Sequence, residues 1–201
     1  MGAPLRLILA STSPYRRMLL ERLRTPFETR SPATDETPLP DESPLALARR
    51  LSLAKAQAVA QHLPEAVVIG SDQTATLDGI KAIGKPGTLE RAKAQLREAS
   101  GKTLRFHSGL AVVCLATGFA EMMVVDTQVR FRELSEAAID RYLSLEPALD
   151  CAGSAKAEGL GISLMSAFES SDPTAIVGLP LIALTQLLAR AGIDVLATQG
   201  D

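Results

Sequence analysis

The chain has 201 residues and a net charge of -2, with 21 basic and 23 acidic residues interspersed along its length. This charge pattern predicts no surface for a nucleic-acid polymer and no polybasic patch for a membrane, so any nucleotide it binds is expected to be a small one. The length fits one domain, residues 1–201, whose core is large enough to fold without disulfides. No apolar run reaches membrane-spanning length and no signal peptide begins the sequence, so we expect a cytoplasmic protein.

The cysteines indicate neither a disulfide framework nor a zinc site. Cys114 and Cys151 are the two cysteines of the sequence, both flanked by apolar or small residues, and no Cys-x-x-Cys motif occurs. His62 and His107 are the two histidines that could pair with them, and without a Cys-x-x-Cys motif these four residues do not indicate a zinc site. We expect both thiols to be buried.

A strand, a turn and a helix start are predicted near the beginning of the chain. The apolar run 5–10 is too short for a surface helix and fits a buried strand. Ser13 is a good N-cap and Pro14 suits the first helical position, so a helix is expected from there to about Arg24.

The turn before this helix has the features of an anion site. Ser11 and Ser13 offer hydroxyl groups, and the main-chain N–H groups there lie at the positive end of the helix dipole, which favours phosphate. Arg16 and Arg17 stand in the first helical turn, where cations are unfavourable unless a bound anion compensates them. The alternative is an ordinary strand-to-helix turn with solvated arginines, and the local residues alone do not decide between the two.

Asp72 follows a buried strand in the middle of the chain. The run 66–70 is continuously apolar, as in a central strand that is covered on both faces, and the strand is predicted to end there. Asp72 would then stand at the strand exit, a frequent position for functional acids. Asp78-Gly79 predicts a hairpin turn between 74–77 and 80–83.

The remaining elements follow from hydrophobic periodicity and turn residues. In chain order they are a short strand at 26–30, a proline-rich loop at 31–40, helices at 44–61, 89–99, 136–146 and 181–191, and two long strands at 103–116 and 121–131. The helix at 44–61 carries Lys55 beside its apolar stripe. Segment 151–161 is rich in small residues, which would allow it to approach a ligand closely.

Several polar side chains together suggest phosphate chemistry. The candidates are Ser11, Ser13, Arg16, Arg17, Glu36, Lys55, Asp72 and Lys85. Cations and hydroxyls of this kind hold phosphates, while the acids hold a metal or activate water, and the sequence shows neither a Walker loop nor an evident covalent nucleophile. Each residue also has an ordinary alternative, because Lys55 can snorkel from its helix, Lys85 can be solvated beside a turn and Glu36 can be one more charge in a loop.

Six motifs in order and spacing resemble the Maf family of nucleoside triphosphate pyrophosphatases. They are Leu-Ala-Ser-Thr-Ser-Pro-Tyr-Arg-Arg at 9–17, Asp-Glu at 35–36, Lys-Ala at 55–56, Gly-Ser-Asp-Gln at 70–73, Gly-Lys-Pro at 84–86 and Val-Gly-Leu-Pro at 177–180. The resemblance implies an α/β fold with an elongated, twisted mixed sheet, flanking helices and two lobes around a nucleotide cleft, often as a homodimer. It also implies hydrolysis of a nucleoside triphosphate between the α and β phosphorus atoms with a divalent metal cation, Mg, Mn or Co.

The resemblance assigns roles to individual residues. Asp72 matches the proton acceptor of the family, and Glu36 an acid near the metal. Arg16, Lys55 and Lys85 match phosphate-contacting cations, and the same signature gives Ser11, Ser13 and Arg17 to the phosphates. Whether Asp72 acts as base, as metal ligand or as both is left open.

Three positions bear on the base. Tyr15, Gln73 and Glu158 resemble the branch of the family that acts on 7-methyl-GTP. A physical reason is available, because N7-methylated guanine is positively charged and attracts an aromatic face, while a carboxylate accepts hydrogen bonds from its N1–H and amino groups. The alternative is that Tyr15 and Glu158 are merely exposed.

The expected reaction is therefore hydrolysis of 7-methyl-GTP to 7-methyl-GMP and pyrophosphate. Two other readings stay open. One is the same reaction on dTTP and UTP, and the other is a non-catalytic regulator of cell division.

Overall fold

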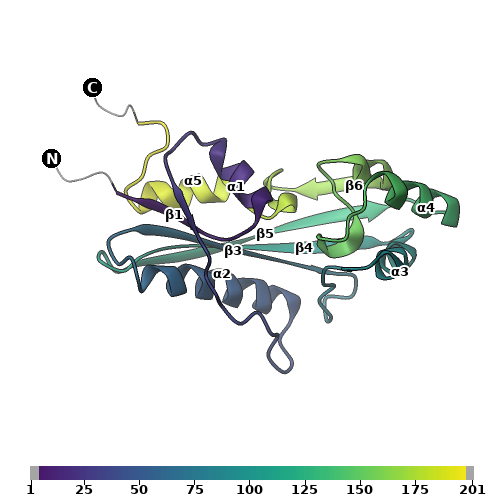
Figure 1. Ribbon diagram of the computed structural model, residues 1–201, viewed down its shortest axis with the longest axis horizontal. Coiled ribbons are helices and arrows are strands. Elements are labelled where there is room, and N and C mark those ends of the chain that lie inside the picture. Colours follow the sequence, from purple (N-terminus) through teal and green to yellow (C-terminus); the bar gives the residue numbers. More distant parts are fainter. Residues whose placement is uncertain (1–4, 198–201) are drawn as a thin grey trace.

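A six-stranded mixed sheet runs through the molecule in the order β2-β1-β3-β4-β5-β6 (Figure 1). The computed structural model describes residues 5–197. The strands are β1 (Leu7–Ala10), β2 (Glu28–Arg30), β3 (Val67–Thr76), β4 (Thr103–Cys114), β5 (Phe119–Phe131) and β6 (Met165–Ser170). The helices are α1 (Pro14–Glu21), α2 (Pro44–Ala60), α3 (Leu89–Ala99), α4 (Glu136–Leu145) and α5 (Leu181–Arg190), with short 3-10 turns η1 (Ala152–Ser154), η2 (Leu160–Leu164) and η3 (Ala175–Val177). β1 is parallel to β2 and β3, and the other neighbours are antiparallel.

The two ends of the sheet are covered by different helices. At one end, α1 and α5 lie on one face and α2 lies on the other (Figure 1). The first face buries residues such as Leu9, Ile69 and Leu184, and the second buries Ile8 and Val68 under α2. α3 and α4 cover the other end, over a separate core. The expected α/β class, with a mixed sheet and flanking helices, is confirmed.

Two glycines let α2 lie directly on the sheet. Gly70 on β3 and Gly109 on β4 face the helix, and a Cβ added at Gly70 would lie 2.2 Å from the Ser52 carbonyl oxygen. A Cβ at Gly109 would lie 2.4 Å from the Ala48 carbonyl oxygen. A side chain at either glycine would therefore push the helix away from the strands. This close approach fixes how near the residues of α2 come to β3.

The prediction for the strand before Asp72 was wrong about its end. β3 continues to Thr76, because antiparallel pairing with β4 extends to the pair Thr76↔Arg105. Asp72 therefore lies inside the strand and not at its exit. The hairpin predicted around Asp78-Gly79 is reduced to one bridge, Ala75↔Ile83. The Asp78 carboxylate holds the turn by accepting hydrogen bonds from the main-chain N–H groups of residues 80 and 81.

Most of the other elements lie within a few residues of their predicted bounds. The helix at 89–99 begins and ends as predicted, and Ser13, Ser43 and Ser135 cap their helices through their side chains. β6 was not anticipated. Cys114 is buried as predicted, and Cys151 is partly buried. No helix within residues 5–197 has the length and apolar character needed to cross a membrane.

Candidate active site

The edge of β3 that faces β1 is open over four residues. β1 pairs with β3 only as far as Ala10↔Gly70, and the next partner on that side is Ile83, opposite Ala75. Residues 71–74 have no strand partner on this side within the described part of the chain. Asp72 lies within this stretch, next to an edge of β3 that no other strand covers.

Lys55 joins two carboxylates at the opening. Its ammonium nitrogen lies 2.6 Å from Asp72 Oδ1 and 2.6 Å from Glu36 Oε1. Lys55 and Asp72 are nearly buried, with 6% and 10% of their side-chain surfaces exposed, whereas Glu36 is 61% exposed on the proline-rich loop. The close packing of α2 on Gly70 brings Lys55 to Asp72, two residues further along the same face of β3.

Arg16 completes this charged group from the first turn of α1. Ser13 caps the helix by accepting a hydrogen bond from the Arg16 main-chain N–H, and Ser11 Oγ accepts one from the Ser13 N–H. Arg16 Nε donates to the carbonyl oxygen of Gly178 at 2.9 Å. Burial lowers the pKa of the Arg16 guanidinium, and the nearby charges of Asp72 and Glu36 oppose that lowering.

Gly178 is a positioning residue whose role was missed at the sequence level. Its carbonyl oxygen lies within hydrogen-bond distance of both Arg16 Nε and Ser71 Oγ, so it ties α1 to β3. Its φ is 105°, a left-handed conformation that glycine adopts without strain. The Val-Gly-Leu-Pro motif at 177–180 was the available signal, but the motif by itself gave no partner for this carbonyl.

Burial sets the chemistry of Asp72. Desolvation raises the pKa of its carboxyl, while the nearby charges of Lys55 and Arg16 oppose that rise. A carboxylate with a raised pKa is a better proton acceptor than a solvated one. Charged donors beside it can hold phosphate oxygens, so the group suits hydrolysis of a phosphate ester or anhydride.

Tyr15 is engaged in a separate cluster. Its hydroxyl donates to Asp150 Oδ2 at 2.7 Å and accepts a hydrogen bond from Lys156 Nζ at 3.0 Å. The same ammonium lies 5.4 Å from the centre of the Tyr15 ring and 3.2 Å from Asp150 Oδ1. Tyr15 thus links α1 to segment 150–156, and its ring already has a cation beside it.

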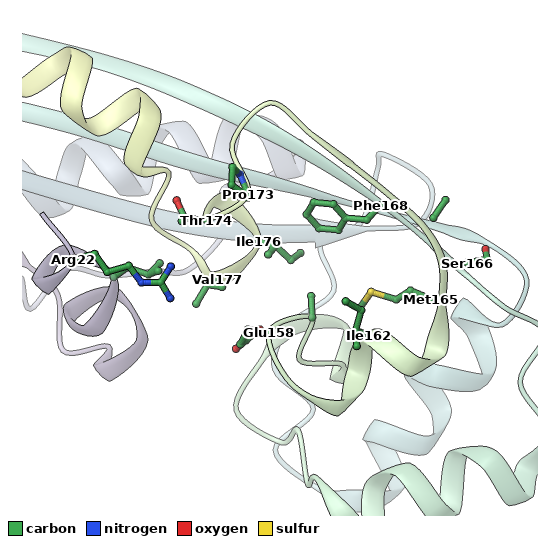
Figure 2. Close-up of a pocket in the computed structure, with 13 residues that line it drawn as sticks. Arg22, Glu158, Ile162, Met165, Ser166, Phe168, Pro173, Thr174, Ile176 and Val177 are labelled. Carbon is green, nitrogen blue, oxygen red and sulfur yellow. The ribbon is translucent and has the colours of Figure 1, made fainter.

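A mostly apolar pocket of about 410 Å³ opens next to this cluster. Figure 2 shows it between α1, η2, β6 and η3. Leu19 on α1 and Arg22, its C-cap residue, line the pocket four and seven residues after Tyr15, so all three lie on one side of this helix. Glu158, which is exposed, lines the opposite side.

Gln73 borders this pocket through the main chain of η3. Its amide nitrogen lies 2.8 Å from the Ala175 carbonyl oxygen and 3.0 Å from that of Ile176. It also lies 3.0 Å from Ser108 Oγ. Gln73 therefore holds η3 in place, and the Ile176 side chain lines the pocket.

Two of the predicted phosphate ligands lie apart from Asp72. Arg17 forms an exposed ion pair with Glu21 on the outer face of α1. Lys85 is exposed and lines a second pocket, of about 480 Å³, against α3. No hydrogen bond or ion pair joins Lys85 to Asp72 among the described residues.

Comparisons with known proteins find relatives that match nearly the whole chain. The Maf-like protein family matches residues 6–191 of the chain. The 7-methyl-GTP pyrophosphatase of Bordetella avium (strain 197N) is 60% identical over 189 residues, which are 94% of each chain. That of Albidiferax ferrireducens is 54% identical over 191 residues, 95% of this chain and 96% of the relative. The structure of a HAM1 protein from Coxiella burnetii covers 92% of this chain and 99% of its own, with a TM-score of 0.55 and 14% identity, a likeness in fold alone.

Proposed function

This chain belongs to the Maf family and is a nucleotide pyrophosphatase, and from that premise we propose that it hydrolyses 7-methyl-GTP to 7-methyl-GMP and pyrophosphate. Several relatives that are more than half identical over nearly the whole chain carry that activity in their names. The observation that supports the catalytic part is the group of Asp72, Lys55, Glu36 and Arg16 at the open edge of β3. The resemblance to the family makes Asp72 the proton acceptor, Lys55 and Arg16 phosphate-contacting cations, and Glu36 an acid near the metal.

In the proposed reaction Asp72 accepts the proton of the attacking water. Its raised pKa, caused by burial, suits that role, and Lys55 keeps enough of it ionised to act. Lys55 and Arg16 stabilise the charge that develops on the phosphate oxygens as the anhydride breaks. The turn with Ser11 and Ser13 adds main-chain N–H groups at the start of α1, where an anion is favoured.

The residues present fit a divalent cation that is shared with the substrate. Among residues 5–197, no group of three His, Cys, Asp or Glu side chains is arranged to hold a metal by itself. Asp72 and Glu36 do converge on one ammonium, and Mg²⁺ commonly takes one or two carboxylates together with phosphate oxygens and water. Glu36 and Asp72 would hold the ion, which supplies charge stabilisation to the phosphates when bound. The identity of the metal stays a prediction.

Recognition of the base is assigned to the region around Tyr15, Gln73 and Glu158. Glu158 accepts from the guanine N1–H and amino group, which thymine and uracil do not present as a pair. Gln73 acts indirectly, because its amide is bonded to the main chain of η3. Three expectations remain predictions: that Lys85 and Arg17 contact the phosphates, that the protein forms a homodimer, and that it is cytoplasmic.

Product analysis with four nucleotides tests this function. The purified chain is incubated with Mg²⁺ or Mn²⁺ and 7-methyl-GTP, GTP, dTTP or UTP, and pyrophosphate and monophosphate are both quantified. We expect pyrophosphate release to be fastest from 7-methyl-GTP and to be lost in Asp72→Asn. Faster turnover of dTTP or UTP would contradict the substrate, and turnover of no nucleotide would favour the non-catalytic regulator.

A further inference from the structure

The pocket beside α1 contains an aromatic ring that the proposed function leaves unused. Phe168 projects from β6 into the pocket, near Ile176 and Pro173 (Figure 2). It is 42% exposed although it is a large apolar residue. Ile162, at 64%, is another exposed apolar residue that lines the same pocket. An apolar pocket of about 410 Å³ with few polar groups is typical of a small-molecule site.

We propose that this pocket is the seat of the purine base and that Phe168 is the aromatic residue that recognises its N7-methylated ring. The proposal rests on the proposed function and deepens it. A positively charged, planar base is attracted to the face of an aromatic ring, and the attraction is stronger where water is excluded. Phe168 provides such a face at the pocket wall.

Tyr15 is less suited to this task than its sequence position suggests. Its ring lies 5.4 Å from the Lys156 ammonium, and its hydroxyl is bonded to Lys156 and Asp150. A cationic base that stacked on this ring would meet the like charge of Lys156 at short range. Phe168 has no cation over its ring in the described part of the chain.

The charged side chains at the rim of the pocket include one that suits the hydrogen-bond donors and the charge of the base. Glu158 presents a carboxylate for the N1–H and amino donors of guanine, and its negative charge also favours a cationic base over a neutral one. Arg22 is the other charged side chain of the lining, and it lies on the α1 side. Glu158, of opposite charge, lies at the edge of the pocket on the loop that precedes η2 (Figure 2).

The pocket is also connected to the phosphate-binding residues. Val177 lines the pocket, and the next residue, Gly178, accepts the hydrogen bond of Arg16. Ser71, bonded to the same carbonyl, directly precedes Asp72. The pocket wall at Val177 is therefore joined through Gly178 to Arg16, the residue proposed to bind the phosphates.

Steady-state kinetics of Phe168→Leu and Phe168→Trp test the proposal, with Leu145→Ala as a control at an exposed apolar residue on α4. We expect Phe168→Leu to raise KM for 7-methyl-GTP by about tenfold, to change KM for GTP by less than about threefold and to leave kcat nearly unchanged. Phe168→Trp should restore the preference, and Leu145→Ala should behave like the wild type. Circular dichroism confirms that each variant is folded.

Direct binding separates this proposal from the proposed function. Titration calorimetry with 7-methyl-GMP and GMP should show tighter binding of the methylated nucleotide by the wild type, and the difference should disappear in Phe168→Leu. Folded Phe168→Leu that keeps the wild-type preference in both assays would overturn the role of Phe168. Loss of the preference in Tyr15→Leu instead would move the base to Tyr15. If the wild type releases no pyrophosphate from 7-methyl-GTP, the proposed function fails. If the wild type binds 7-methyl-GMP and GMP with equal affinity, the proposal that this pocket recognises the methylated base also fails.

Discussion

The two ends of the proposed nucleotide site differ in burial and in the secondary structure that carries their residues. At the phosphate end, Asp72 and Lys55 are nearly buried, and they come from the middle of a long strand and a long helix. At the base end, Phe168, Ile162 and Glu158 are exposed, and they come from an outer strand, a 3-10 turn and a loop.

The difference shows how the fold divides rigidity and adaptability. Charged groups that perform chemistry need fixed positions, which a strand and a helix in direct contact provide. A pocket that selects among bases can be altered on exposed segments without disturbing the buried sheet. Changes at the phosphate end should therefore affect both catalysis and stability, whereas changes at the base end should affect mainly substrate choice.

Asp72→Asn should have the largest effect on catalysis. The amide keeps the size of the side chain but cannot accept the proton of water, so kcat should fall by roughly 10²- to 10⁴-fold. Pyrophosphate release at saturating 7-methyl-GTP measures the loss, and 7-methyl-GMP should still bind. A variant with wild-type kcat would remove Asp72 from the role of base.

Gly70→Ala should cause the largest loss of stability. The added methyl group would overlap the main chain of α2, so we expect a loss of about 1–3 kcal/mol in the free energy of unfolding. Lys55 would also move away from Asp72, and kcat should fall. The matched control is Gly84→Ala, where a Cβ meets nothing within 4 Å. Equal urea denaturation midpoints for the two variants would contradict the close packing of α2.

Lys55→Met should shift the pH dependence of the reaction. Burial raises the pKa of Asp72 and the charge of Lys55 lowers it, so loss of the ammonium should raise that pKa further. The reactive form is the carboxylate, so the rise of kcat with pH should move to higher pH. Because a raised carboxyl pKa favours the protonated folded state, the stability of the variant should fall more steeply than that of the wild type as pH rises through the new value. An unchanged acidic limb would argue against the Lys55 contact.

Tyr15→Phe should have the smallest effect and should sharpen the comparison at the base end. The change removes the hydrogen bonds to Asp150 and Lys156 but keeps the ring, and the cluster is only partly buried, with Asp150 exposed. We expect a change of about 1 kcal/mol or less in unfolding free energy and kcat close to that of the wild type. Thermal unfolding and KM for 7-methyl-GTP are the measurements. A large fall in kcat would show that the link between α1 and segment 150–156 controls the chemistry.

Local patterns anticipated most helices because their signals are local. The N-caps at Ser13, Ser43 and Ser135 and the periodic apolar residues placed the five α-helices of residues 5–197 within a few residues of their observed bounds. The end of β3 could not be read in the same way. Its second half contains Ser71, Asp72 and Gln73, polar residues that look like a strand exit until β4 is present to pair with them.

The site shows the same limit. The motifs identified Asp72, Lys55, Glu36 and Arg16 separately, but their spacing along the chain could not show that one ammonium lies between two carboxylates. Gln73 was expected at the base, and the structure bonds its amide to η3. Phe168 carried no signal at all, because an aromatic residue in a short strand normally packs into a core.

The sequence by itself determined the capped helices and the residue types that suit phosphate hydrolysis, because these depend on local propensity and on side-chain chemistry, and its motifs implied the class of fold through their resemblance to the Maf family. Only the tertiary structure decided which of those residues meet. Gly70 and Gly109 allow α2 to touch the sheet, and the Gly178 carbonyl joins Arg16 to β3. Such contacts join segments that are far apart in the chain, so no local pattern records them. The open edge of β3, where Asp72 stands, exists because β1 ends at Ala10 and the next partner begins only at Ile83.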